Sequence, residues 1–280
     1  MKHLTIGMAP SRTFPGNWWD MAEVCAKLGL DGIEFKHELP FILPENWSWE
    51  MVKRIASLAK DKNWVLSLHG PYTNIGALLP RRWRAAVDEH LEALEVAETL
   101  GARTYTIHPG WVEEKYCTPD LLRRCRDKTS EALAEILAHS DGVKVCVENQ
   151  NPSEKEKAKA GVSPENLHYL VRDLPGAMFT FDVGHAYVFN QDPEKFAVLL
   201  GPKRIGLAHV HDNAGSEDSH LPPGRGAIDW IGFLNRYCAD RWDFPLFLET
   251  VGSEAEFRMG RDFLVRVWEE ASIKEGVDGH

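Results

Sequence analysis

The stretch MFTFDVGH, residues 178–185, is a short apolar run that ends in a carboxylate and an imidazole. Its length and its aromatic content predict a buried β-strand. Successive strand residues point to opposite faces, so Phe179 and Phe181 share one face while Thr180 and Asp182 share the other. The strand therefore has one apolar face and one polar face, and the polar face carries an acid at its carboxyl end.

The same pattern recurs along the chain, with apolar runs separated by amphipathic helical segments and spaced by roughly 30 to 40 residues, as strand–helix repeats require. Eight alternating units predict the α/β class and a single (β/α)8 TIM barrel. The first turn, MAPSRTFPG, lacks the GxGxxG pattern of a dinucleotide-binding fold. The other seven predicted strands are HLTIGM (3–8), GIEFK (32–36), WVLSLHG (64–70), TYTIHPG (104–110), KVCVENQ (144–150), IGLAHVHD (205–212) and PLFLETV (245–251).

The sequence also predicts helix boundaries and the limits of the domain. The pairs Thr118-Pro119 and Ser163-Pro164 predict helix starts, because each puts a capping hydroxyl before a proline in the first turn. Gly101 and Gly201 predict helix ends. No linker divides the chain, so we expect one domain over residues 1–275 and a flexible tail at 276–280.

The composition limits the partners. The chain has 280 residues, with 42 acidic against 32 basic side chains and a formal net charge of −10, which offers no broad attraction for nucleic acid or an anionic membrane. The five cysteines form no CxxC pair and are expected to be reduced thiols. No signal-peptide or membrane-spanning run is present, so we expect a cytoplasmic protein with no membrane partner.

Polar residues gather at one end of the predicted barrel. The parity rule directs several side chains inward at the carboxyl ends of their strands, which is the face where barrel enzymes place their chemistry. Converging buried carboxylates need compensating positive charge, and no matching set of inward lysines or arginines is evident. The mixed ligands therefore predict a divalent cation such as Zn, Mn, Fe or Co. The inward residues are His69, His108, Glu148, Asp182 and Glu249, with His209 and His211 from the seventh strand.

The loop after the seventh strand extends this set. In HVHDNAGSEDSHLPPGRGAIDW, residues 209–230, Asp218 and His220 are candidate ligands of a further ion. Arg225 is expected to bind an oxyanion or phosphate of the substrate, because a guanidinium matches such groups with paired donors. His211 and Trp111 are further candidates for substrate contact, Trp111 as an apolar platform.

At these motifs the chain resembles the xylose-isomerase-like barrel superfamily. That superfamily includes sugar and sugar-phosphate isomerases and epimerases, inosose dehydratases and the endonuclease IV class of AP endonucleases. The resemblance spans essentially the whole chain, and several motifs together are specific to the superfamily but not to one activity. The motifs are GLDGIEF (29–35), LHGPYTNI (68–75), IHPG (107–110), VCVEN (145–149), FDVGHA (181–186), the 208–230 block and FLET (247–250).

The two branches imply different metal sets. The epimerase branch implies one ion, with the two glutamates also moving protons, on Glu148, Asp182, His209 and Glu249. The endonuclease branch implies three zincs on a larger set: His69, His108, Glu148, Asp182, His185, His209, Asp218, His220 and Glu249. The ligand of the seventh strand stays open, because the His-x-x-Asp spacing favours His209 and nearness to the mouth favours His211.

Three functions follow as hypotheses. The first is a metal-dependent isomerase or epimerase of a small sugar or sugar phosphate, working through an enediolate with Glu148 and Glu249 as acid and base. The alternative is an AP endonuclease with three zincs, which would bind nucleic acid, although no basic or wedge-bearing loop is evident and Arg81, Arg82 and Arg84 suit a solvated helix start. The third is a non-catalytic barrel or accessory subunit. A homodimer is compatible with each.

Overall fold

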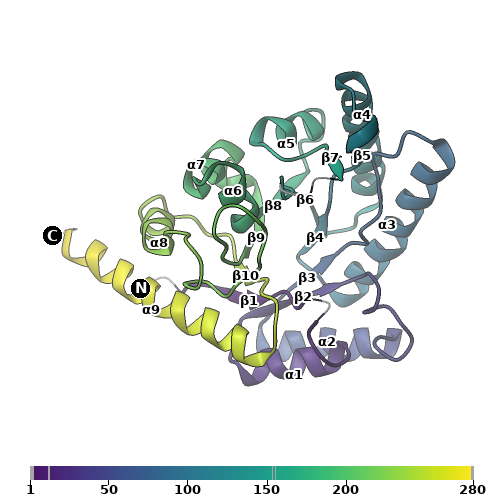
Figure 1. Ribbon diagram of the computed structural model, residues 1–280. Coiled ribbons are helices and arrows are strands. Elements are labelled where there is room, and N and C mark those ends of the chain that lie inside the picture. Colours follow the sequence, from purple (N-terminus) through teal and green to yellow (C-terminus); the bar gives the residue numbers. More distant parts are fainter. Residues whose placement is uncertain (1–2, 12, 153, 155, 279–280) are drawn as a thin grey trace.

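The computed structural model describes residues 3–11, 13–152, 154 and 156–278, and within them eight parallel strands close a barrel (Figure 1). Neighbouring strands follow the order β1-β10-β9-β8-β6-β4-β3-β2. This confirms the predicted (β/α)8 fold class. The strands are β1 (Ile6–Met8), β2 (Gly32–Lys36), β3 (Val65–His69), β4 (Thr104–Ile107), β6 (Lys144–Glu148), β8 (Met178–Asp182), β9 (Ile205–Val210) and β10 (Leu246–Leu248).

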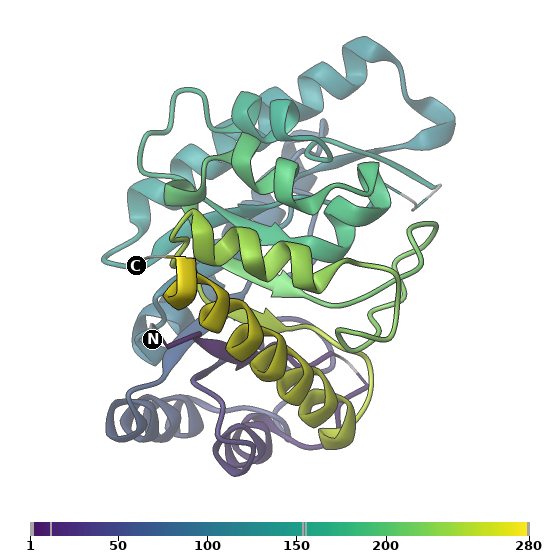
Figure 2. The same ribbon diagram turned by 90° about the vertical axis from the view of Figure 1, so that its left-hand side faces the viewer.

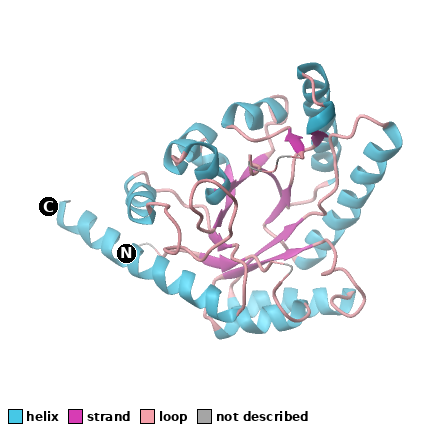
Figure 3. Cartoon of the chain, viewed as in Figure 1, coloured by secondary structure: helices cyan, strands magenta, loops and turns pink. Residues whose placement is uncertain are grey.

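Helices surround the barrel on the outside, as the cyan ring around the magenta strands shows (Figure 3). The last two, α8 and α9, pack side by side (Figure 2). No helix among the described residues combines the length and apolar character needed to cross a membrane. The helices are α1 (Trp18–Lys27), α2 (Trp49–Lys62), α3 (Pro80–Leu100), α4 (Pro119–His139), α5 (Pro164–Leu170), α6 (Val183–Asn190), α7 (Pro193–Leu200), α8 (Trp230–Ala239) and α9 (Glu254–Asp278), with 3-10 turns at Glu114–Tyr116 and Pro202–Arg204.

The predicted helix boundaries are confirmed. The hydroxyls of Thr118 and Ser163 each accept a hydrogen bond from the backbone N–H three residues later, which satisfies one of the free donors at a helix start. Gly101 and Gly201 end α3 and α7 with φ of 73° and 85°, a backbone that favours glycine. The predicted tail 276–280 lies partly outside the described residues, and α9 includes residues 276–278.

A small ribbon was not predicted. The strands β5 (Trp111–Glu113) and β7 (Lys157–Lys159) follow β4 and β6 along the chain and pair antiparallel. Each strand is only three residues long, which is too short for an alternation of apolar and polar residues to identify it. The ribbon adds a wall above the carboxyl ends of the barrel strands.

The barrel interior separates an apolar layer from a polar one. The ring of Phe247 lies inside the barrel, and a Cβ at Gly7 would come within 2.5 Å of it, so only glycine fits there. Hydroxyls occupy the interior nearer the mouth: Thr106 Oγ1 and Thr180 Oγ1 are 2.8 Å apart and both residues are buried. The inward parity expected for the strands is therefore observed, and the polar layer leads up to a cavity.

Candidate metal centre

A cavity of about 480 Å³ opens at the carboxyl ends of the strands. Its walls come from strand ends and from the loops that follow β6 and β9. All nine predicted metal ligands lie in or directly beneath this cavity, in three clusters whose potential ligand atoms lie within 4.8 Å of one another. The residues lining it include His69, His108, Glu148, His185, Asp218, His220 and Glu249.

The first cluster, here called the tetrad, consists of Glu148, Asp182, His209 and Glu249. All four residues are buried, with at most 5% of any of them exposed. His209 Nδ1 lies 3.1 Å from Glu148 Oε1, 3.4 Å from Glu249 Oε2 and 3.9 Å from Asp182 Oδ2. Three carboxylates thus converge on one imidazole nitrogen.

The second cluster shares a residue with the tetrad. It consists of His69, His108 and Glu148. Glu148 Oε2 lies 2.8 Å from His108 Nε2 and 3.3 Å from His69 Nε2. Because Oε1 of the same carboxylate faces His209, the two oxygens of Glu148 serve different clusters.

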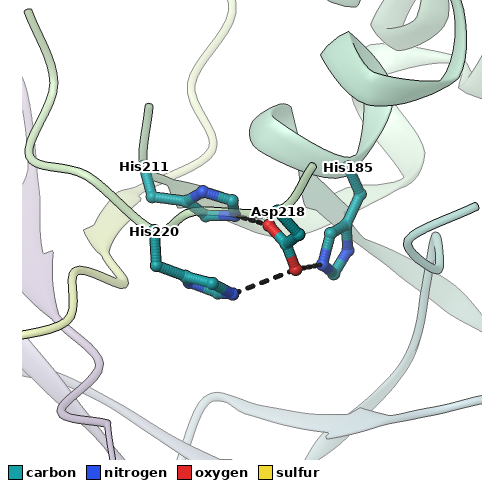
Figure 4. A group of neighbouring side chains, drawn as sticks. All are labelled: His185, His211, Asp218 and His220. Carbon is teal, nitrogen blue, oxygen red and sulfur yellow. Dashed lines mark hydrogen bonds and ion pairs between the residues drawn. The ribbon is translucent and has the colours of Figure 1, made fainter. Parts of the chain in front are cut away.

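The third cluster consists of His185, His211, Asp218 and His220 (Figure 4). Asp218 Oδ2 lies 3.0 Å from His185 Nε2 and 3.1 Å from His220 Nε2, and Oδ1 lies 3.6 Å from His211 Nε2. The rings of His211 and His220 stack with centroids 3.9 Å apart. His209 and His211, which the sequence could not separate as ligands, therefore lie in different clusters.

The residues present fit divalent cations. Asp218 Oδ1 is buried and has no hydrogen-bond partner, so it is an acceptor that lacks a donor. Burial opposes ionisation of Glu148, but His108 and His209 hold its pKa well below the usual range, so the carboxylate is charged. Charged buried oxygens mixed with imidazole nitrogens are the ligands of Zn, Mn and Co in proteins.

The third cluster is strongly basic without metal. Burial opposes protonation of His185, but Asp182 and Asp218 more than offset it and raise its pKa to about 10. Burial opposes protonation of His220 as well, and its contact with Asp218 raises its pKa to about 9. The imidazoles of His185 and His220 are thus protonated at the place where a cation would be held, and metal binding would displace these protons.

Glu34 is a further candidate residue that was not predicted from the sequence. It is fully buried, and its Oε1 lies 2.7 Å from His209 Nε2. Its Oε2 accepts hydrogen bonds from Ser67 Oγ at 2.6 Å and Thr106 Oγ1 at 3.1 Å. Since an ionised carboxylate only accepts, His209 donates from Nε2 and presents Nδ1 to the tetrad. The alternation in GIEFK directs this glutamate inward and could have identified it.

Lys36 is a single inward lysine, not the matching set of basic residues that the carboxylates would need. It lines the cavity, and its Nζ lies 2.5 Å from Glu249 Oε1. It shares the parity of Glu34 on β2 and so points inward. One lysine does not neutralise the carboxylates of three clusters, which therefore still require other positive charge.

The carboxylate of Asp212 anchors the loop that follows β9. Its carboxylate accepts four hydrogen bonds, from Trp230 Nε1 and from the backbone N–H groups of Asn213, Gly224 and Ile228. These bonds tie both ends of the loop to the end of β9. The loop in turn carries Asp218 and His220 into the third cluster.

The three residues predicted to contact substrate lie in different places. His211 is buried in the third cluster. Trp111 does not line the cavity but stacks at 5.2 Å on Tyr72, which does. Arg225 is exposed, its Nε lies 3.0 Å from Met259 Sδ, and it is not among the described residues that line the cavity.

Comparison with known proteins agrees with this architecture. The sequence matches the xylose isomerase-like TIM barrel family over residues 22–267. A solved structure of a D-tagatose 3-epimerase-like protein aligns with a TM-score of 0.85 at 23% identity, covering 97% of this chain and 99% of that chain. At this identity the likeness is one of fold.

Two sequence relatives are informative. The uncharacterized protein MJ1311 of Methanocaldococcus jannaschii is 28% identical over 249 residues, covering 85% of this chain and 81% of its own length. A probable endonuclease 4 of Campylobacter fetus subsp. fetus is 25% identical over 206 residues, covering 65% of this chain and 69% of its own length.

Proposed function

This chain belongs to the xylose isomerase-like TIM barrel family, and on that premise we propose that it is a metal-dependent isomerase or epimerase of a small sugar or sugar phosphate. The observation that carries the proposal is the buried tetrad at the floor of a cavity of about 480 Å³. Such a cavity suits a small molecule, and the tetrad places two glutamates beside it.

The strand order gives the two glutamates distinct positions. Along the barrel, β10, β9, β8 and β6 are neighbours, so Glu249, His209, Asp182 and Glu148 follow one another in that order. The glutamates thus stand at the two ends of the tetrad. A divalent ion bound there would act as a Lewis acid on a substrate carbonyl and its adjacent hydroxyl. Glu148 and Glu249 would remove a proton from carbon and return it, on different sides of the substrate.

The charge around the cavity favours a small substrate over DNA. Glu38 and Glu154 line it together with Lys36 and Lys159, so the wall is not a basic groove. The whole chain carries a net charge of −10. A duplex approaching this face would meet little of the positive potential by which proteins attract phosphate backbones.

A second candidate is phosphodiester hydrolysis at a centre of three ions. The observation that favours it is the pair of further clusters around the tetrad, which a single-ion mechanism does not require. Three ions would neutralise a phosphate and lower the pKa of a water nucleophile, and both effects are typical of multinuclear sites. A relative named as a probable endonuclease 4 is compatible with this candidate.

One set of measurements separates the two. Protein purified without chelator is analysed for metal, then incubated in D₂O with ketoses and their phosphates, and separately with a phosphodiester and an abasic-site duplex. Deuterium entering at the carbon beside the carbonyl supports the isomerase, and cleavage of the diester supports the hydrolase. His220→Ala should spare the first activity and abolish the second, because only the second needs the third cluster. Absence of metal after reconstitution would refute both.

A further inference from the structure

Lys36 is a charged residue at the cavity floor that has no role in the proposed reaction. It ends β2, its side chain is 11% exposed, and it lines the cavity. Building on the proposed function, we propose that Lys36 binds an anionic group of the substrate, a phosphoryl or carboxylate, beside the tetrad. The substrate class would then be a sugar phosphate or sugar acid and not a neutral sugar.

The geometry leaves Lys36 able to do this. Its ammonium has three donors, and Glu249 Oε1 accepts from one of them at 2.5 Å. The other oxygen of Glu249 faces His209 in the tetrad, so Lys36 stands one carboxylate away from the ion that the tetrad would hold. A substrate oxygen within reach of the remaining donors would therefore also be within reach of the reacting centre.

Charge balance selects an anion as the partner. The tetrad, Asp218, Glu38 and Glu34 together bring six carboxylates to the cavity and its floor. When divalent ions fill all three clusters, the histidine ligands are neutral, so the ions and Lys36 supply seven positive charges and leave a surplus of one. A buried surplus of positive charge is costly unless an anion joins it. A lysine held beside the ions then contributes a directional, charge-assisted hydrogen bond to that anion.

The residue expected from sequence to bind such a group does not occupy this place. Arg225 contacts Met259 and is not among the described residues lining the cavity. Lys159 does line it, but its Nζ lies 2.6 Å from Glu154 Oε2, and Glu154 belongs to none of the three clusters. Lys159 is thus a matched control: a second buried lysine of the same cavity, paired with a carboxylate outside the candidate metal centre.

The test uses inorganic phosphate as the probe and the zinc-loaded full chain. Isothermal titration compares the unsubstituted protein with Lys36→Met, Lys36→Arg and Lys159→Met, all brought to equal zinc content and checked for fold by circular dichroism. We expect Lys36→Met to weaken phosphate binding about tenfold or more, the usual worth of a hydrogen bond to a charged group. Lys36→Arg should retain most of the affinity because it keeps the charge, and Lys159→Met should bind as the unsubstituted protein does.

Each other outcome counts against the inference. Equal phosphate affinity in Lys36→Met and the unsubstituted protein would overturn it, as would a zinc-loaded protein that does not bind phosphate. If Lys36→Met cannot be brought to the zinc content of the unsubstituted protein, Lys36 acts by holding Glu249, and the inference is also wrong. A chain that takes up no zinc at all would refute the proposed function as well, whereas the preceding outcomes leave it intact.

Discussion

His209 and Glu34 form a hydrogen bond of 2.7 Å inside the barrel, between imidazole Nε2 and carboxylate Oε1. The bond couples the tetrad to the polar layer beneath it, since Glu34 also accepts from Ser67 and Thr106. The orientation of a candidate ligand on β9 is therefore set by β2, a strand that is not its neighbour in the barrel.

Replacing Glu34 by Gln should weaken metal binding at the tetrad by about 10- to 100-fold, the usual effect of losing a carboxylate that orients a histidine ligand. The amide no longer favours an N–H at Nε2, so the ring loses its fixed tautomer. Zinc affinity measured by competition with a chelator tests this. Ser67→Ala, which removes one donor to Glu34 but leaves the carboxylate, should have a smaller effect, and equal effects would contradict the proposed role.

Glu148→Gln should reduce kcat by about 10²- to 10⁴-fold, because it removes the proposed acid–base group. It should also lower metal uptake at two clusters at once, since both oxygens of Glu148 serve as candidate ligands. Metal analysis and the D₂O exchange assay measure the two effects. Glu154→Gln, which alters a carboxylate of the same cavity outside the clusters, is the control and should change neither.

Asp212→Ala should selectively lose the ion of the third cluster. The substitution leaves four donors in the β9 loop without their acceptor, and unsatisfied buried donors cost about 1–3 kcal/mol each. The loop that carries Asp218 and His220 should then loosen while the tetrad stays intact. A lower Tm together with a loss of part of the bound metal is the expected result. A full complement of metal would show that the loop is held by other contacts.

Acid stability should depend on His90. It is buried, with Nδ1 2.7 Å from the Tyr105 hydroxyl, and burial, with smaller contributions from nearby histidines, lowers its pKa to about 3. Between pH 6.5 and pH 3, His90 is protonated in the unfolded chain but stays neutral in the folded chain. The free energy of unfolding is therefore unaffected by His90 above pH 6.5 and decreases as the pH falls below it, by up to about 1.4 kcal/mol per pH unit.

Urea unfolding at a series of pH values measures this slope. His90→Gln should show a shallower loss of stability below pH 6.5 than the unsubstituted protein, because its side chain does not titrate. The same substitution at His139, an exposed residue of α4, serves as the control and should leave the slope unchanged. An unaltered slope in His90→Gln would mean that other groups govern acid unfolding.

The fold was predictable because its signals are local and repeated. The eight barrel strands lie within the predicted runs. The parity of MFTFDVGH is observed in β8, since Thr180 contacts Thr106 inside the barrel and Asp182 belongs to the tetrad. The ribbon of β5 and β7 was not predictable, since strands of three residues are defined only by their pairing. Pairing between distant strands is a tertiary property that alternation does not encode.

The candidate site was predictable as a set of residues but not as an arrangement. Parity brought His209 and His211 to the same mouth, but only the observed strand ends and loop assign them to different clusters. Glu34 lies in the middle of β2 and Lys36 is not a metal ligand, so the pattern of histidines and acids at strand ends includes neither. Both follow from the alternation in GIEFK.

The carboxylate of Glu148 cannot tilt toward one cluster without withdrawing from the other, because each of its oxygens faces a different set of nitrogens. Ions bound at the two clusters would then be thermodynamically linked: an ion at one cluster would change the affinity of the other, and by the same factor in return.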